Sequence, residues 1–244
     1  MNKKEKESKF VPKVIHYCWF GKSPLPEDAK KCIESWKKFM PEYKIIEWNE
    51  ENFDINQNKY VKEAYGGKKY AFVSDYARLK IIYDHGGIYF DTDVELIKRI
   101  PEKFLKNGYL AREDKKYINT GLGFAAKKNN KTIKRMLDDY MVIPFVKEDG
   151  AFDMTPCPVR NTKSIKILKH IDLEILQPEY ASPLNWKNGV LGITKNTFSI
   201  HHYEASWSDD DSKKRLAKRH SNAKKYGHIL GDVFYMMGRI LGRY

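Results

Sequence analysis

The chain has 244 residues, of which 41% are hydrophobic, and it carries a formal net charge of +13. This length and apolar content fit one globular domain with additions and exclude a largely disordered protein. No apolar run approaches the ~18 residues of a membrane-spanning helix, and the charged start MNKKEKESKF lacks the apolar core of a signal peptide. With three cysteines and no CxxC spacing, the sequence predicts free thiols in a cytoplasmic protein, either soluble or peripheral on the inner face of the cell membrane.

Strands and helices are expected to alternate along the chain. The expected strands cover 11–20, 43–48, 88–93, the neighbourhood of Tyr109, 118–126 and 198–203. The expected helices cover 26–39, 68–85, 132–142 and 162–170, and the second of these stops at Gly86-Gly87. This order predicts an α/β fold, a sheet with helices on both faces.

Two short motifs in the first half of the chain carry the strongest chemical signal. The helix expected over 68–85 contains SDYAR at 74–78, and the following strand ends in Asp91-Thr92-Asp93. Alternation along that strand would place Asp91 and Asp93 on one side, about 6.6 Å apart at the backbone. Carboxylates so placed suit Mg²⁺ or Mn²⁺ with substrate phosphates. The alternative is two solvent-facing aspartates at a strand end.

Asp75 and Arg78 are spaced i, i+3 and are therefore neighbours on one helix surface. They could form an exposed ion pair worth about 0–1 kcal/mol. Alternatively, Asp75 could accept hydrogen bonds from sugar hydroxyls while the Arg78 guanidinium binds sugar or phosphate oxygens. The spacing alone leaves both interpretations open.

Several ordered motifs together resemble one enzyme family. These are KVIHYCWFG at 13–21, SDYAR at 74–78, GGIYFDTD at 86–93, INTGLGF at 118–124 and HHYEASW at 201–207. In this order they resemble the glycosyltransferases named for a DXD sugar-binding segment. That family includes yeast-type initiating mannosyltransferases, bacterial capsular polysaccharide transferases and, more distantly, the glucosylating domains of large clostridial toxins. The resemblance runs from about residue 11 to residue 207.

The resemblance implies a GT-A type fold, a Rossmann-like mixed sheet that binds a nucleoside diphosphate sugar. In it, Trp19 would stack on the base and Trp207 would reach the diphosphate, although both could instead be core aromatics. The implied catalytic residues are Asp75, Arg78, Asp91 and Asp93. The implied donor-binding residues are Trp19, Asp75, Arg78, Tyr89, Asp91, Asn119, Ser206 and Trp207. Mn²⁺ or Mg²⁺ would be held by Asp93, His202 and Asp91.

The implied activity is metal-dependent, retaining transfer of a sugar from a UDP- or GDP-sugar. The acceptor would be a glycan or a lipid-linked oligosaccharide in capsular or cell-surface polysaccharide synthesis. The chain departs from the family at 154–158, where a Gly-Pro pair is usual, and at Thr120, where a second Asn is commoner. The alternative function is that of a catalytically inactive, basic protein that binds a membrane or a nucleic acid. The sequence contains no nucleic-acid-binding motif, so a nucleic acid is not expected as a partner.

The sequence predicts three parts: a charged segment over 1–10, a GT-A domain over 11–211 and a basic amphipathic helical extension over 212–244. The extension contains nine Lys or Arg residues and one Asp, with apolar residues at helical spacing beyond Gly227. Such a helix could lie on an anionic membrane surface or cap the core.

Overall fold

The computed structural model describes residues 9–186, 188–203 and 214. Most of the predicted N-terminal segment, the predicted extension over 212–244 except Lys214, and the candidate residues Ser206 and Trp207 lie outside the described residues. None of the helices within the described ranges is long and apolar enough to span a bilayer.

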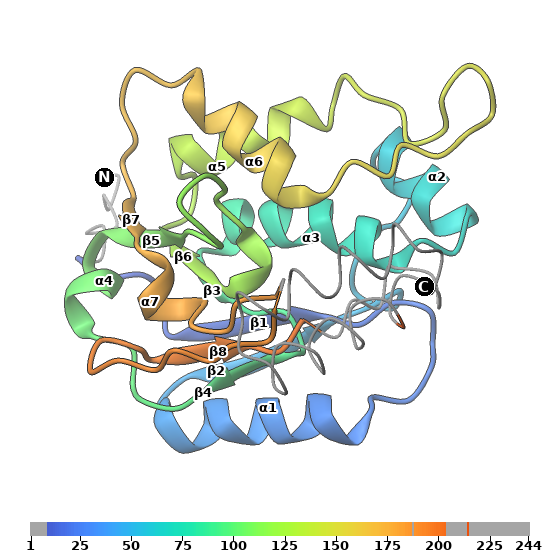
Figure 1. Cartoon of the computed structure of the whole chain (residues 1–244). Coiled ribbons are helices and arrows are strands. Elements are labelled where there is room, and N and C mark those ends of the chain that lie inside the picture. The colour runs from blue at the N-terminus through green and yellow to red at the C-terminus, as the bar shows by residue number, and fades with distance from the viewer. Residues whose placement is uncertain (1–8, 187, 204–213, 215–244) are drawn as a thin grey trace, which may run out of the picture.

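A mixed sheet of six strands forms the centre of the fold (Figure 1). Its spatial order is β2 (Lys44–Trp48), β1 (Val14–Cys18), β3 (Gly87–Tyr89), β6 (Phe124–Ala126), β5 (Gly108–Ala111) and β7 (Glu174–Leu176). The pairs β1–β2, β1–β3 and β5–β7 are parallel, whereas β6 is antiparallel to both of its neighbours. The prediction of a mixed α/β sheet is confirmed.

Helices cover both faces of this sheet, as predicted (Figure 1). One face packs against α1 (Glu27–Phe39), whose apolar stripe includes Cys32, Ile33 and Trp36. The other face packs against α3 (Tyr70–His85). Helix α5 (Lys131–Asp139) packs on α3, and α6 (Cys157–Lys166) packs on α5. The sequence did not predict α2 (Lys59–Gly66), α4 (Glu102–Asn107), α7 (Pro178–Ala181) or the 3₁₀ turn η1 (Thr120–Leu122).

The strand predicted over 88–93 is present as β3 but its predicted end is wrong, because the chain leaves the main sheet after Tyr89. The amide of Val94 donates to the Asp91 carbonyl at 3.1 Å, which closes a turn around the two aspartates. The chain then enters β4 (Val94–Leu96), which pairs antiparallel with β8 (Ser199–His201) in a separate two-stranded sheet. Asp91 and Asp93 therefore project from a turn between two sheets.

The helix predicted over 162–170 is also misplaced, since α6 begins at Cys157. Pro156 precedes the helix in an extended conformation and Pro158 lies in its first turn, where a missing N–H costs no hydrogen bond. The earlier start brings Cys157 to the helix N-terminus, where it faces α3.

His16 in β1 has two defined partners in the core. The Trp48 indole N–H donates to His16 Nδ1 at 3.0 Å, and because an indole nitrogen only donates, Nδ1 must be the unprotonated nitrogen. Nε2 therefore carries the proton and donates to the Gly86 carbonyl at 3.0 Å. Burial lowers the pKa of His16 from 6.5 to about 4, although the Gly86 hydrogen bond raises it in part.

We predict that His16 makes the protein less stable in mild acid. Below pH 6.5 the unfolded chain takes up a proton at His16 that the folded protein takes up only near pH 4, so stability falls as the pH falls through this window. Between about pH 7 and about pH 5 this loss is about 2 kcal/mol. Urea unfolding of wild type and His16→Gln at both pH values measures it, with His170→Gln as a control at an exposed position. Equal pH dependence in wild type and His16→Gln would contradict the prediction.

Candidate functional site

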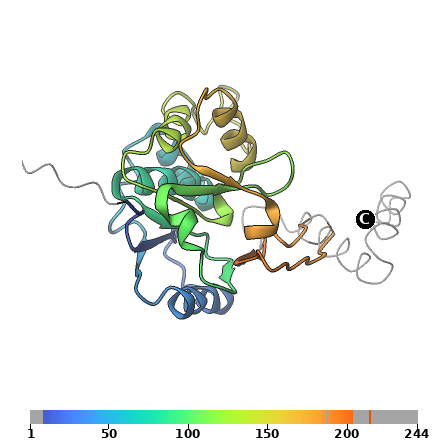
Figure 2. The same ribbon diagram turned by 90° about the vertical axis from the view of Figure 1, so that its left-hand side faces the viewer.

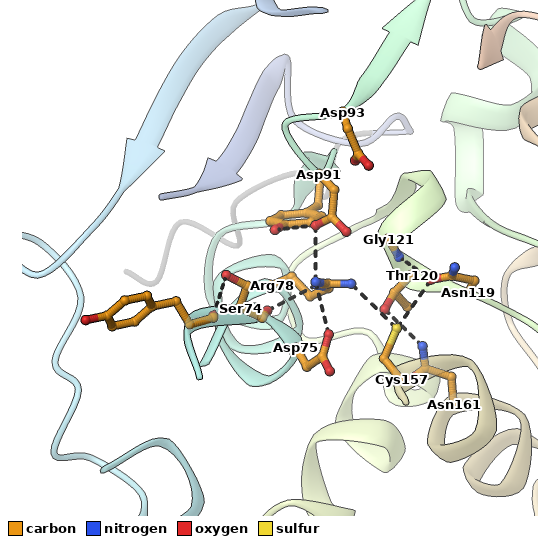
Figure 3. Close-up of polar contacts among 12 residues, drawn as sticks. Ser74, Asp75, Arg78, Asp91, Asp93, Asn119, Thr120, Gly121, Cys157 and Asn161 are labelled. Carbon is orange, nitrogen blue, oxygen red and sulfur yellow. Dashed lines mark hydrogen bonds and ion pairs between the residues drawn. The ribbon is translucent and has the colours of Figure 1, made fainter. Parts of the chain in front are cut away.

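The guanidinium of Arg78 lies at the centre of a buried polar cluster (Figure 3). Its Nη2 atom is 3.0 Å from Asp75 Oδ1 and 3.1 Å from Asp91 Oδ1. The Arg78 side chain is only 4% exposed, so this is not the exposed ion pair that the spacing also allowed. One arginine thus joins a carboxylate on α3 to a carboxylate in the turn after β3.

Further contacts fix the plane of the guanidinium. Arg78 Nε donates to the Ser74 carbonyl at 3.1 Å, one turn earlier on α3. The guanidinium carbon lies 5.2 Å from the centre of the Tyr89 ring, and the Tyr89 hydroxyl donates to Asp91 Oδ1 at 2.9 Å. A planar, stacked guanidinium with several partners is held in one orientation, which a lysine ammonium would not be.

The charges in this cluster do not balance. Burial raises the pKa of Asp75 to about 6, even though the positive charge of Arg78 acts in the opposite direction. Burial also raises the pKa of Asp91, again against the effect of Arg78, and the charge of Asp93 raises it further. Two carboxylates therefore share one arginine while the charge of Asp93 acts on Asp91, and this concentration of carboxylates favours an added cation.

A cation site is suggested by Asp91, Asp93 and His201. These residues each place a ligand atom within 4.8 Å of the others. His201 Nε2 is 3.2 Å from Asp93 Oδ1, and although burial alone would lower the pKa of His201, the charge of Asp93 raises it overall. Among the described residues, the buried Nδ1 atom of His201 has no hydrogen-bond partner. Two carboxylates and an imidazole form a donor set that suits Mn²⁺ or Mg²⁺.

The histidine beside Asp93 is His201 and not the predicted His202. His201 pairs with Val94 across the small sheet, and side chains alternate along a strand, so the next residue faces away. His202 Nε2 lies 3.0 Å from Glu95 Oε2, outside the cluster, and only the His202 backbone amide contacts Asp93, by donating to its carbonyl at 3.0 Å.

Asn119 and Cys157 form the wall of the cluster opposite the Ser74 carbonyl (Figure 3). The Asn119 side-chain oxygen accepts from the Gly121 amide at 2.7 Å and from Cys157 Sγ at 3.3 Å. Cys157 Sγ in turn accepts from Arg78 Nη1 at 3.7 Å. Asn119, which the family resemblance places in the donor site, is therefore linked to Arg78 through Cys157. Cys157 was not identified as a site residue from the sequence.

Trp19 follows β1 and is half-buried against the core cluster that contains α1. Its indole N–H donates to the Ser23 carbonyl at 2.6 Å. No contact described in the structure links this side chain to Arg78 or to the aspartates, so stacking on a base stays a prediction.

Gly121 lies against the carboxylate of Asp91. A Cβ atom at this position would lie 2.5 Å from Asp91 Oδ2 and 3.0 Å from Asn119 Oδ1. The carboxylate is held by Arg78 and Tyr89, so it cannot move away without losing these contacts.

We predict that Gly121→Ala displaces Asp91 and weakens ligand binding at the site by about tenfold or more, corresponding to an overpacking cost of about 1–3 kcal/mol. The matched control is Gly66→Ala on α2, where an added Cβ meets nothing within 4 Å. Calorimetric titration of both variants with Mn²⁺ measures the effect, and wild-type binding by Gly121→Ala would contradict it.

Comparison with known proteins gives a family match for one segment of the chain. Residues 26–114 match the model of the glycosyltransferase sugar-binding region containing a DXD motif. This matched segment agrees with the family that the sequence motifs resemble, the DXD-containing glycosyltransferases. The matched region includes Asp75, Arg78, Asp91 and Asp93, whereas His201 comes from a later part of the chain.

Two curated proteins are similar to this chain. Subversion of eukaryotic traffic protein A of Legionella pneumophila is 22% identical over 78% of the chain, and an uncharacterised glycosyltransferase of Acanthamoeba polyphaga mimivirus is 31% identical over 41% of it. The matches span only 34% and 41% of the lengths of these relatives. Among solved structures, PaToxG glycosyltransferase superposes with a TM-score of 0.51 at 22% identity, covering 64% of this chain and 69% of that one. This last similarity supports the GT-A-like fold.

Proposed function

We propose that the protein is a metal-dependent glycosyltransferase that moves a sugar from a nucleoside diphosphate sugar to a hydroxyl group of a glycan. One observation carries the proposal. Asp91 belongs both to the Arg78 ion-pair cluster and to the group of possible metal ligands, so a sugar site and a cation site would share one carboxylate. In a nucleoside diphosphate sugar, the sugar is bonded directly to the diphosphate, so the donor would place its sugar in the first site and its diphosphate at the cation.

The residues present fit a divalent cation. Asp91, Asp93 and His201 would hold it, and the buried Nδ1 atom of His201, which has no hydrogen-bond partner among the described residues, leaves that nitrogen available to a ligand. When bound, Mn²⁺ or Mg²⁺ supplies a Lewis acid that stabilises negative charge on a diphosphate.

Side chains of the protein would bind the sugar and stabilise the transition state. Asp75, whose pKa burial raises to about 6, would accept hydrogen bonds from sugar hydroxyls or, when protonated, donate one to them. The guanidinium of Arg78 would place a fixed positive charge beside the bond that breaks, which stabilises the transition state more than the substrate. Around them, the proposed donor-binding residues are Trp19, Tyr89, Asn119, Ser206 and Trp207.

The resemblance to retaining transferases supports retention at the anomeric carbon. We propose a front-face path in which the leaving diphosphate helps to deprotonate the acceptor hydroxyl, because this path needs no protein nucleophile. A glycosyl–protein adduct trapped during turnover and detected by mass spectrometry would contradict it. The proposed acceptor is a glycan or a lipid-linked oligosaccharide of a cell-surface polysaccharide, assembled on the cytoplasmic face of a membrane.

The test is calorimetric titration with a panel of UDP- and GDP-sugars, each measured with Mn²⁺ and again with EDTA. We expect one donor to bind tightly and only with metal, which would also identify the base and the sugar. If no donor bound in either condition, the transferase proposal would be contradicted and the binding-protein alternative favoured.

A further inference from the structure

A hairpin over 183–197 projects from the body of the fold between α7 and β8. Its arms meet where Leu184 pairs with Leu191, and the Asn185 amide donates to the Val190 carbonyl at 2.9 Å. In Figure 2 the orange segment that follows α7 extends away from the layers of the fold. The described residues of the hairpin, 183–186 and 188–197, therefore form a projection whose arms are hydrogen-bonded to each other and which almost directly precedes β8.

The returning arm of this 183–197 hairpin exposes consecutive apolar side chains. Val190, Leu191 and Ile193 are 43%, 48% and 52% exposed, and they are separated only by Gly192. Single exposed apolar residues are common on soluble proteins, but several adjacent ones on one projection mark an interaction surface.

The charged residues of the hairpin sequence are both lysines. From Tyr180 to Tyr203 the sequence contains lysines but no Asp or Glu. Lys98 adds a further positive charge at the base, where its ammonium donates to the Lys195 carbonyl at 3.0 Å. The nearest acidic residue along the chain, Glu179, accepts a hydrogen bond from Asn196. Apolar side chains with basic neighbours complement an anionic lipid surface, in which acyl chains lie below negative headgroups.

We propose that the 183–197 hairpin docks the protein on an anionic lipid bilayer, with Val190, Leu191 and Ile193 entering the interface. The hairpin is followed almost directly by β8, and the hydroxyl of Ser182, just before the hairpin, lies 2.7 Å from the hydroxyl of Tyr203, just after β8. Docking would therefore set the Asp91–Asp93–His201 cluster at a fixed height above the membrane. The inference is independent of the proposed transferase activity.

The test is co-sedimentation of the full-length protein with phosphatidylcholine vesicles, prepared with and without phosphatidylglycerol. Wild type is expected to partition onto the anionic vesicles, and less so in high salt. Leu191→Ser/Ile193→Ser is expected to weaken this partitioning by about tenfold or more, since each apolar side chain that leaves water contributes substantially.

The matched control is Val142→Ser/Ile167→Ser, which removes two apolar residues that are 81% and 62% exposed outside the hairpin. Both double variants keep the basic segment 212–244, so a difference between them reports on the hairpin alone. Wild-type partitioning by the hairpin variant, or an equal loss in the control, would overturn the proposal. So would a hairpin-dependent change in sedimentation mass without lipid, which would assign the surface to a second copy of the chain.

A second measurement locates the contact directly. Lipids brominated on their acyl chains quench tryptophan fluorescence at the interface, and Trp186 lies in the hairpin. We expect quenching in wild type that Trp186→Phe largely removes. Undiminished quenching in Trp186→Phe would show that another part of the protein enters the bilayer and would contradict the assignment.

Discussion

Asp93→Asn is expected to reduce kcat/KM by about a hundredfold to a thousandfold, the size of effect seen when a group that helps to stabilise transition-state charge is removed. Asparagine keeps the shape of the side chain but removes the charge that lies 3.2 Å from His201 Nε2. Mn²⁺ affinity, measured by calorimetry without donor, should fall in the same variant. The unfolding midpoint in urea should stay near that of wild type, which separates a lost ligand from a lost fold.

The matched control for this prediction is Glu95→Gln, which removes a carboxylate two residues further along the chain. Glu95 is half-buried and its partner is His202, outside the cation cluster. We expect this variant to keep both Mn²⁺ binding and turnover. His201→Ala should behave like Asp93→Asn, and His202→Ala like Glu95→Gln. If Asp93→Asn turned over donor as wild type does, the metal assignment would be wrong.

The sequence predicts the elements whose stabilising contacts are local. Helix α1 was predicted within one residue because its buried residues Ala29, Cys32, Ile33 and Trp36 repeat at helical spacing. The i, i+3 pair of Asp75 and Arg78 was predicted for the same reason, since one helix turn sets their distance.

The features that the sequence did not predict depend on long-range contacts. Whether His201 or His202 faces Asp93 is a one-residue question of register, and the pairing of β8 with β4 decides it. Cys157 contacts Arg78 across 79 residues of sequence, and no local pattern around Pro156-Cys157-Pro158 announces that contact. The end of β3 at Tyr89 is not predicted, because the apolar strand pattern continues through Phe90. The turn is closed by the hydrogen bond from the Val94 amide to the Asp91 carbonyl, which the sequence pattern does not reveal.

Replacing Arg78 is expected to affect stability and function together, and the size of the effect follows from burial. Arg78→Ala leaves Asp75 and Asp91 buried without their shared cation, and breaking a buried ion pair in this way costs about 3–5 kcal/mol. Arg99→Ala is the control, because its exposed pair with Glu42 should contribute less than about 1 kcal/mol. Urea unfolding of the two variants at neutral pH makes the comparison.

Arg78→Lys separates the two roles of this residue. It keeps a positive charge near both carboxylates, so most of the stability lost in Arg78→Ala should return. The ammonium lacks the planar fork that contacts Asp75, Asp91 and the Ser74 carbonyl at once and stacks on Tyr89. Donor binding with Mn²⁺ should therefore remain about tenfold or more weaker than in wild type, since a bidentate contact cannot be replaced by a point charge. Arg78→Lys with wild-type donor affinity would show that Arg78 supplies only charge balance, and the sugar-binding role would then have to pass to Asp75 and Asn119.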